Sequence, residues 1–173
     1  VVLNPLPYGD SGQLLAVDFA IPTRIIPAGI AMPTRLYYHS LDRARTISGL
    51  AFYRRQEMTV SGRGAPERIG GLLTAPTLAS VLRVAPAHGR WFTDDESAPG
   101  AAGVAVISHG MWTRRFGADP GVLGRQLTLD GEPRTIVGVM PATFAIPDPA
   151  VDVWVPMPLT RASSRLSATA RMR

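Results

Sequence analysis

With 173 residues, 46% of them hydrophobic and 18% charged, the chain can bury the core of one ordinary domain or two small lobes, which excludes wholesale disorder. The net charge of +5 comes from 18 basic residues that are all arginine and are scattered without a basic stripe, so we expect no nucleic-acid partner. The absence of cysteine excludes a thiol nucleophile, a disulfide framework and a thiolate metal site, and the absence of lysine excludes a phosphate-binding P-loop.

The first quarter of the chain predicts a strand, an irregular loop and a helix. A Pro- and Gly-rich stretch at 1–12 leads into LLAVDF at 14–19, which predicts a strand. Three prolines within 21–33 predict an ordered but irregular loop, because each fixes φ and removes a backbone donor. From Thr34, apolar residues at helical spacing predict an amphipathic helix that ends near Gly49. Its apolar face would comprise Tyr37, Leu41, Ala44 and Ile47.

Three short strands are expected next, at 49–53, 57–62 and 67–75, with the polar residues RRQ separating the first two. Pro76 is acceptable in the first turn of a helix, so a short helix should follow, with Pro86 and Gly89 stopping it. Its apolar stripe would consist of Leu78, Val81 and Leu82. The three strands that follow the first helix suggest a small α+β layer.

An almost wholly apolar run at 104–108 predicts a strand inside a sheet. Ser108 is a suitable N-cap for the helix that follows, in which Trp112 and Phe116 share one face, and Gly117 is the C-terminal stop.

Asp119-Pro120 should cap a second short turn that points Leu123 inward. Alternation around Asp130-Gly131 predicts a hairpin over 125–140, in which Pro133 restricts the start of the second strand to an edge or non-donating position.

DVWVPM at 152–157 predicts a last strand, and the tail at 159–173 has charge but little apolar periodicity. No stretch approaches the roughly 18 uncharged apolar residues of a membrane span. The chain starts abruptly, without an initiator Met or a signal-peptide pattern, and we expect it to be a segment of a longer protein.

Candidate reactive groups do not form a convincing set. The three histidines, His39, His88 and His109, lack a zinc-type partner three or four residues away, and adjacent Ser108 and His109 would point about 100° apart on a helix. The acidic run Asp94-Asp95-Glu96 lacks the spacing of a calcium loop, and we expect it to cap a local turn. Neither Glu67 nor Asp148 can be placed to complete a cation site. We therefore predict no catalytic, cofactor or metal residues.

The three tryptophans, Trp91, Trp112 and Trp154, lie beside apolar or strand-like neighbours in the sequence. Packing in a core or between lobes is therefore expected for them rather than a sugar- or base-binding platform.

Three stretches resemble the extracytoplasmic domain of ABC transporter permeases of the MacB, FtsX and LolC type, especially the duplicated permeases common in acidobacteria. They are VLRVAPAHGRWFTDDE at 81–96, the run from VAVIS to FAIP at 104–147, and DVWVPM. The likeness lies in the order and spacing of R-x-F, S-x-x-x-W-x-x-x-F-G, G-x-x-x-x-x-D-G and V-G-V-M-P, and it covers about 1–12 and 34–160.

The resemblance implies a periplasmic domain of a bacterial inner-membrane protein, with one transmembrane helix before residue 1 and three after the segment. It implies a homodimer driven by a cytoplasmic ATPase subunit or domain, a periplasmic adaptor or cargo, and no catalysis, cofactor or metal in this domain. The fold should be α+β with two lobes: a porter-like lobe at 1–90, an inserted mainly-β lobe with a short helix at 91–160, and a return at 161–173.

Two features depart from the family pattern. The proline-bearing loop at 21–33 differs from the Ser-rich approach to the first helix, and the chain stops where the last porter strand would begin. The closing strand and helix of that lobe are therefore expected beyond 173.

Two other functions stay open at this point. One is a periplasmic module that binds lipid or peptide in a groove near Ile25, Ile26 and Ile30. The other is an esterase or glycosidase that uses Ser108 or the acidic run 94–96.

Overall fold

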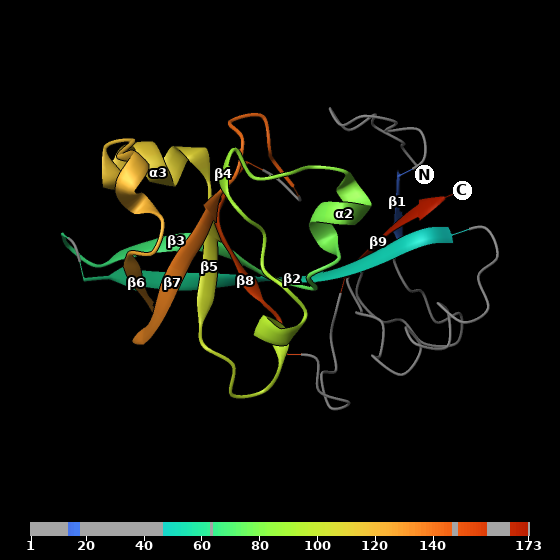
Figure 1. The fold of residues 1–173 in the computed structure, drawn as a ribbon, viewed down its shortest axis with the longest axis horizontal. Coiled ribbons are helices and arrows are strands. Elements are labelled where there is room, and N and C mark those ends of the chain that lie inside the picture. The colour runs from blue at the N-terminus through green and yellow to red at the C-terminus, as the bar shows by residue number, and fades with distance from the viewer. Residues whose placement is uncertain (1–13, 18–46, 63, 147–148, 159–166, 173) are drawn as a thin grey trace, which may run out of the picture.

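The computed structural model describes residues 14–17, 47–62, 64–146, 149–158 and 167–172. The predicted loop at 21–33 and the predicted helix from Thr34 as far as residue 46 lie outside these ranges. Within them, nine strands form one mixed sheet accompanied by a few short helices, which confirms the α+β class (Figure 1). The strands are β1 (Leu14–Val17), β2 (Ile47–Ser61), β3 (Glu67–Thr74), β4 (His88–Gly89), β5 (Val104–Ile107), β6 (Gln126–Leu129), β7 (Glu132–Val139), β8 (Val151–Pro156) and β9 (Ser167–Met172). The α-helices are α2 (Leu78–Leu82) and α3 (His109–Phe116), and the 3-10 helices are η2 (Asp95–Ser97) and η3 (Pro120–Val122).

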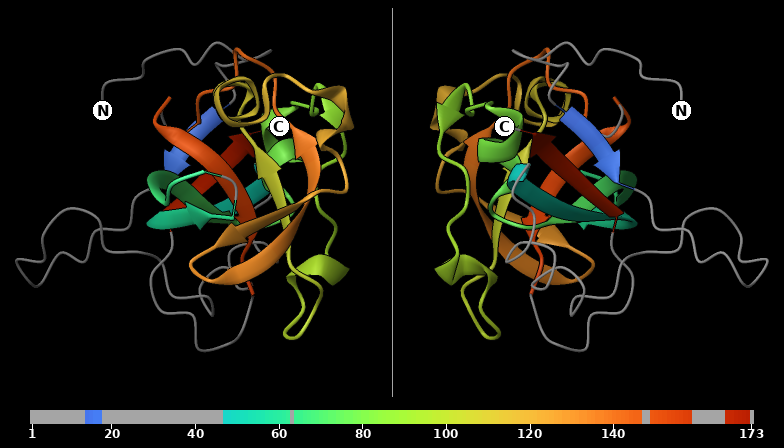
Figure 2. Two further views of the ribbon diagram at one scale, coloured as in Figure 1. Left: turned by 90° about the vertical axis from the view of Figure 1, so that its left-hand side faces the viewer. Right: turned by 90° about the vertical axis from the view of Figure 1, so that its right-hand side faces the viewer.

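Six of the strands close into a barrel. Following the hydrogen-bonded neighbours from β2 leads to β3, β8, β5, β7 and β6, and β6 pairs with β2 again. Pairs β3–β8 and β5–β7 are parallel, and the other four are antiparallel. The end-on views in Figure 2 show these strands curving around one another rather than lying in a flat layer. Closure reduces the exposed sheet edge in this part of the molecule, although the β2–β6 and β5–β8 ladders have two residue pairs each.

Strand β2 extends beyond the barrel into a smaller part of the same sheet, which it forms with β9 and β1. Its first half pairs with β9, which in turn pairs with β1, and its second half pairs with β3. Tyr53 is the crossover residue, opposite Ser167 of β9 on one side and Thr74 of β3 on the other. Figure 1 shows β2 running from the barrel to β1 and β9.

The prediction of two strands at 49–53 and 57–62 is therefore wrong, because they form one continuous strand. Residues 54–57 are exposed, which is why the polar run suggested a break. Their backbone groups nevertheless pair with β3 throughout, from Arg54 opposite Leu73 to Glu57 opposite Gly70. The predicted helical position of Ile47 is wrong as well, since Ile47 is the first residue of β2.

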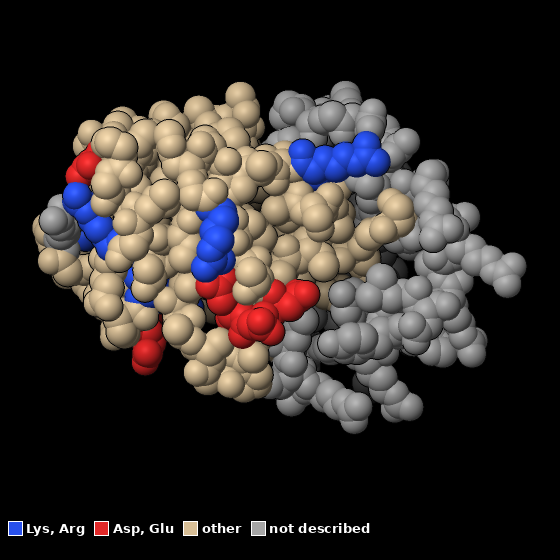
Figure 3. Space-filling model, in the orientation of Figure 1, with Lys and Arg blue, Asp and Glu red and all other residues tan. Residues whose placement is uncertain are grey.

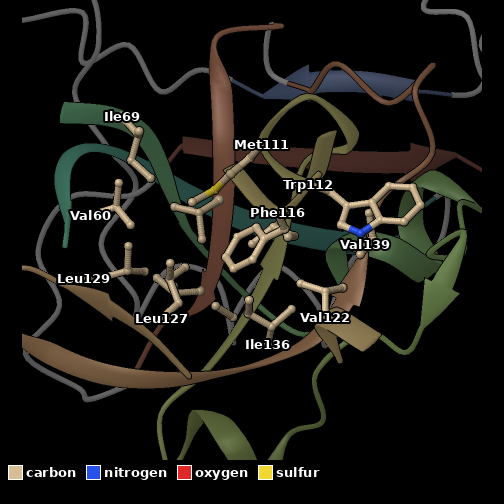
Figure 4. Close-up of a cluster of buried hydrophobic side chains, with 14 of the residues drawn as sticks. Val60, Ile69, Met111, Trp112, Phe116, Val122, Leu127, Leu129, Ile136 and Val139 are labelled. Carbon is tan, nitrogen blue, oxygen red and sulfur yellow. The ribbon is translucent and has the colours of Figure 1, made fainter. Parts of the chain in front are cut away.

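The interior of the barrel is filled by apolar side chains, with α3 packed against it. Met111 and Phe116 of α3 point into the same cluster as side chains from β2, β3, β6 and β7 (Figure 4). Trp112 lies at the edge of this inner cluster. Members from the strands include Val60, Ile69, Leu127, Leu129, Ile136, Val139, Val153 and Val155.

A second apolar cluster covers the outside of the barrel. Alternate residues of β5 contribute to the two clusters: Ala105 and Ile107 to the inner one, Val104 and Val106 to the outer one. The outer cluster also includes α2 residues, Phe92, Phe144, Ile146 and Trp154. The apolar run of β5 is thus buried on both faces, as its sequence predicted.

The expected caps of α3 are confirmed. The Ser108 side chain accepts from the Met111 N–H, and Gly117 ends the helix in the left-handed conformation at φ 62°. The Asp119 side chain accepts from the Gly121 N–H at the start of η3. Leu123, however, is exposed rather than inward-pointing, and its neighbour Val122 is the buried residue.

The hairpin around Asp130-Gly131 is confirmed, with Leu129 opposite Glu132. Pro133 lies opposite Thr128 of β6, and β7 acquires its β5 partner only from Thr135 onward. Pro133 therefore sits where β7 is paired on one side, as expected of a residue without an N–H.

The short helix α2 differs from its prediction at both ends. Its N-cap is Thr77, so Pro76 precedes the helix, and the Thr77 hydroxyl donates to the Leu50 carbonyl of β2. The helix ends at Leu82, where Arg83 adopts a left-handed conformation with φ 53°, earlier than Pro86.

The tail contains strand β9, which the weak apolar pattern of 159–173 did not predict. Antiparallel pairing with both β1 and β2 holds β9 in the sheet, although its side chains show little apolar alternation.

Candidate functional site

An extended polar arrangement of described residues joins α3 to the barrel wall. The Ser108 hydroxyl donates to Asp152 Oδ1 over 3.0 Å while accepting the Met111 N–H over 2.9 Å. The second oxygen of Asp152 accepts from Arg114 Nη2 over 2.9 Å. This contact is the main reason that the pKa of Arg114 is raised above its ordinary value. One carboxylate of β8 thus holds the first and the last turn of α3.

Glu67 of β3 completes the arrangement. Its two carboxylate oxygens lie 3.4 Å from Arg114 Nη2 and 3.4 Å from Arg115 Nη1. Two arginines and two carboxylates therefore balance in charge, and together they bridge α3, β3 and β8. We call these residues with Ser108 the α3 polar network: Glu67, Ser108, Arg114, Arg115 and Asp152. The contacts of the α3 polar network fix the position of α3 against β3 and β8.

The network was missed by the sequence analysis, which named only Ser108 and Glu67 among its members. The partners of Arg114 and Arg115 lie 38 to 48 residues away in the chain, so no local spacing could indicate them.

The three residues of the acidic run 94–96 have different surroundings in the structure. Glu96 forms a two-pronged ion pair with Arg90, at 2.7 and 2.9 Å, and accepts the Thr93 N–H over 2.8 Å. The hydrogen bond from Arg90 is the main cause that lowers the pKa of Glu96 below its usual value. Asp94 and Asp95 are exposed. Figure 3 shows acidic side chains gathered over η2, with a basic side chain beside them.

The expected turn after Phe92 is present as η2, but Asp94 makes no side-chain cap to it. The carboxylate of Glu96 instead binds back to Thr93 and Arg90, which fixes the segment 90–97. A carboxylate held ionised in this way is poorly suited to donate a proton as a glycosidase acid.

The two histidines that the structure describes, His88 and His109, both pack against Trp112. The ring centroid of His88 on β4 is 4.9 Å from that of Trp112, with the planes tilted by 53°, and that of His109 at the start of α3 is 5.5 Å away in an edge-on arrangement at 77°. His39 and Asp148 lie outside the described residues. In the part of the chain that the structure describes, no group of three or more His, Asp or Glu side chains could hold a metal ion.

The tryptophans pack as expected. Trp112 is buried in the inner cluster and donates from Nε1 to the Asp119 carbonyl over 2.9 Å. Trp154 is fully buried with its ring centroid 5.1 Å from that of Phe144, and Trp91 stacks on Phe92 at 4.4 Å. None of these contacts presents an open stacking platform.

Two open hollows are formed by described residues. One of 210 Å³ lies beside the exposed middle of β2 and the glycines of β3, and one of 170 Å³ lies beside the end of α3. Both are smaller than the ~300–1,000 Å³ of usual small-molecule sites. The groove considered near Ile25, Ile26 and Ile30 lies outside the described residues. Among the described residues, no helix is both long enough and apolar enough to cross a membrane.

The model of the MacB-like periplasmic core domain family matches residues 7–172. No match is found among curated proteins.

Three solved structures share the fold. The extracellular domain of the noncanonic ABC-type transporter YknZ from Gram-positive bacteria has a TM-score of 0.68 at 17% identity, covering 92% of this chain and 83% of that chain. The periplasmic region of MacB from Actinobacillus actinomycetemcomitans has a TM-score of 0.63 at 15% identity, covering 87% and 68%. A domain of a putative permease protein from Porphyromonas gingivalis has a TM-score of 0.52 at 18% identity, covering 84% and 62%.

Proposed function

The chain belongs to the MacB-like periplasmic core domain family, the extracytoplasmic domains of inner-membrane ABC transporter permeases, and on this premise we propose that it transmits conformational change without catalysing a reaction. The change would pass between the transporter's membrane helices and a periplasmic cargo or adaptor. A cytoplasmic ATPase subunit or domain supplies the energy, and two copies of the permease work as a dimer.

The observation that carries this proposal is the closed barrel, whose β5 strand is buried on both faces and whose interior is filled by apolar side chains. A closed, densely packed barrel resists deformation, because repacking its interior costs free energy. Such a body can pass on a displacement from one end of the domain to the other. The part of the sheet formed by β1 and β9, which is joined to the barrel through β2, would be the route by which motion reaches the barrel.

The polar groups considered for hydrolysis support a positioning role instead. Ser108 caps α3 and binds Asp152, and Glu96 is held ionised by Arg90. Activation of a serine nucleophile requires a general base within hydrogen-bond reach, usually a histidine. Among the described residues, the groups bonded to the Ser108 hydroxyl are Asp152 and the Met111 amide.

We further propose that the domain has two lobes. They are a porter-like lobe at 1–90 and an inserted lobe at 91–160, and the chain returns to the porter-like lobe at 161–173. The pairs β2–β6 and β3–β8 join strands from both sides of residue 90, so the two lobes would share backbone hydrogen bonds. Motion between them would then be small, and rigid-body displacement of the whole domain would be the larger component.

The experiment measures motion in the full-length transporter. A spin label on exposed Ala85→Cys gives one distance between the two copies of a dimer, and the described domain brings no competing thiol because the chain lacks cysteine. We expect this distance, measured by double electron–electron resonance, to differ between the nucleotide-free and the ATP-bound transporter. A transporter that shows the same distance in both states would contradict the proposal.

A control separates lack of motion from lack of assembly. The Ala85→Cys protein must give a defined inter-copy distance without nucleotide, which establishes the dimer. An absent dipolar signal would contradict the dimer, whereas a nucleotide-independent one would contradict transmission.

A further inference from the structure

Asp130 adds one more position to the ladder that closes the barrel between β2 and β6. The backbone pairs of this ladder are Val60 with Leu129 and Ser61 with Thr128. Thr59 and Asp130 come next in the same antiparallel register. The Asp130 N–H donates to the Thr59 carbonyl over 2.9 Å, and the Thr59 N–H donates to Asp130 Oδ1 over 2.7 Å. Thr59 is therefore bonded as in a ladder, although one of its two partners is a side-chain oxygen.

The turn explains why a side chain completes this position. Strand β6 ends at Leu129, and Asp130 and Gly131 form a two-residue turn with φ angles of 50° and 85°. Positive φ at both central residues suits a two-residue hairpin, and aspartate and glycine adopt it at low cost. The chain thus leaves the ladder at Asp130. Its carboxylate supplies the oxygen that the main-chain carbonyl of a further strand residue would otherwise present.

Few hydrogen bonds hold this ladder. In an antiparallel pair, opposite residues alternate between positions that exchange two hydrogen bonds and positions that exchange none. Since Thr59 and Asp130 exchange two, the next exchanging position is Ser61 with Thr128. Beyond it the pairing gives way to the hollow of 170 Å³, which Gly62 helps to line. Asp130 therefore forms one of the two positions at which β2 and β6 exchange hydrogen bonds.

The ladder covers part of the inner cluster. Val60 and Leu129 are 0% and 2% exposed and belong to that cluster, whereas Asp130 and Gly131 are exposed. Separation of β2 from β6 would admit water to the buried side chains and leave two strand edges without partners. The hydrogen bonds of Asp130, at the exposed margin of the ladder, therefore protect the interior of the barrel.

The other short ladder of the barrel, β5–β8, is braced more strongly. It also has two residue pairs, and the Ser108 N–H extends it by donating to the Asp152 carbonyl over 2.8 Å. Side chains then cross it, because the Ser108 hydroxyl and Arg114 both bind the Asp152 carboxylate. Strand β5 is buried on both faces, whereas the β2–β6 ladder borders an open hollow. Of the two short ladders, β2–β6 is thus the easier one to separate.

We propose that the barrel opens transiently between β2 and β6, and that the Asp130 carboxylate is the latch that keeps this seam shut. The β2–β6 seam comprises residues 59–61 of β2 and residues 128–130. Proteins open locally, without unfolding as a whole, where few contacts hold an element in place. The open form would be a minor population of a barrel that is otherwise closed and rigid. The inference concerns the domain itself and does not depend on the proposed transport function.

Amide hydrogen exchange of the 173-residue chain, followed by NMR, tests the opening. Alternate residues of a strand direct their N–H groups to opposite neighbours. Ser61 therefore directs its N–H to β6, as Thr59 does to Asp130, and Met58 directs its N–H to β3 opposite Ile69. Relative to intrinsic rates, we expect the Ser61 amide to exchange about tenfold faster than the Met58 amide. Its rate should be independent of low urea concentrations, since local opening exposes little surface.

Two substitutions at Asp130 test the latch. Asp130→Gly keeps the turn, because glycine adopts positive φ freely, but removes the oxygen. It should accelerate exchange at Ser61 and Thr128 about tenfold, since a hydrogen bond to a charged group is lost. Both amides report on the seam rather than on the substituted side chain, which accepts from Thr59. Asp130→Asn keeps a side-chain oxygen in the same turn and should change these rates by less than about threefold.

Acceleration at Ser61 and Thr128 in Asp130→Gly, without urea dependence, supports the latch. Unchanged rates in this variant would overturn it, and so would equal acceleration in Asp130→Asn, which retains the oxygen. Equal exchange of Ser61 and Met58 in the parent chain would show that β2 and β6 separate only when the barrel unfolds, and would overturn the local opening. If Asp130→Gly fails to fold while Asp130→Asn folds, the oxygen is required for closure, and the comparison within the parent chain decides whether the seam opens.

Discussion

At the scale of the residue, Ser108 combines two structural contacts in one hydroxyl. It satisfies an otherwise unpaired amide in the first turn of α3 and ties that turn to Asp152 of β8. The same side chain that suggested a nucleophile therefore stabilises the helix that packs against the barrel. The contribution of the Ser108 hydroxyl can be measured as a change in the free energy of unfolding.

Replacing Ser108 with alanine should lower the free energy of unfolding by about 1–2 kcal/mol, because the cap and the link to Asp152 are both lost. Urea unfolding followed by circular dichroism measures the difference. Ser108→Thr keeps the hydroxyl and should lose much less. Equal stability of the alanine variant and the parent chain would show that the cap is dispensable.

The pair of Glu96 and Arg90 predicts a pH dependence. Because Arg90 lowers the folded-state pKa of Glu96 below the ordinary 4.5, the pair stabilises the fold above about that pH and loses its effect as the pH falls through the lowered value. Thermal unfolding between pH 7 and pH 3 should thus show a steeper loss of stability for the parent chain than for Glu96→Gln. Stability curves that run parallel for the parent chain and Glu96→Gln would contradict this. Because Arg90 is half exposed, added salt will screen the stabilising effect of the pair.

Residue patterns predicted the local features well. The cap at Ser108, the stop at Gly117 and the turn at Asp130-Gly131 depend on neighbours within a few residues, which a sequence displays. The α3 polar network depends on Glu67 and Asp152, which only the fold brings to the helix. Leu123 was placed inward because it is apolar, but the register of η3 turns Val122 inward instead.

At the scale of the element, two glycines illustrate opposite constraints. A Cβ on Gly70 of β3 would lie 2.2 Å from the Ala150 carbonyl oxygen, which is backbone and cannot move aside cheaply. A Cβ on Gly110 of α3 would meet nothing closer than Ser108 Oγ at 3.7 Å. Gly70 allows the β3–β8 contact, whereas Gly110 only adds flexibility to a helix.

Gly70→Ala should therefore destabilise the chain by about 1–3 kcal/mol through overpacking. Gly110→Ala should stabilise it by about 0.5–1 kcal/mol, since alanine favours a helix over glycine. Chemical unfolding of both variants beside the parent chain measures the two signs. Stabilisation by Gly70→Ala would show that β3 and β8 are more loosely packed than described.

The prediction of strands failed where backbone hydrogen bonds to neighbouring strands, rather than an alternating side-chain pattern, hold the strand in the sheet. The polar middle of β2 indicated a break, yet β3 supplies hydrogen bonds along it. The tail has little apolar alternation, yet β9 is held between β1 and β2. Long-range pairing leaves no trace in local composition, so neither strand could be read from its own residues.

At the scale of the whole molecule, the inner and outer clusters share the strands of one barrel wall. Ile107 faces one cluster and Val106 the other, so loss of either cluster exposes the same strand. We expect the barrel to unfold as one cooperative unit.

Two variants report on the two clusters. Trp91→Phe with Trp154→Phe leaves Trp112 in the inner cluster, and Trp91→Phe with Trp112→Phe leaves Trp154 in the outer one. In each variant the fluorescence transition in urea should coincide with the circular dichroism transition of the same protein. Fluorescence that changes at a clearly lower urea concentration than the dichroism would reveal a cluster that melts independently.

The most direct test of a rigid transmitting barrel is an internal distance in the full-length transporter. Spin labels on exposed Arg68→Cys of β3 and Glu132→Cys of β7, in labelled subunits diluted with unlabelled ones, report the distance across one barrel. We predict that this distance is the same with and without ATP, while the inter-copy distance at Ala85→Cys changes. An internal distance that shifts as far as the inter-copy distance would show that the barrel deforms, and would contradict transmission by a rigid barrel.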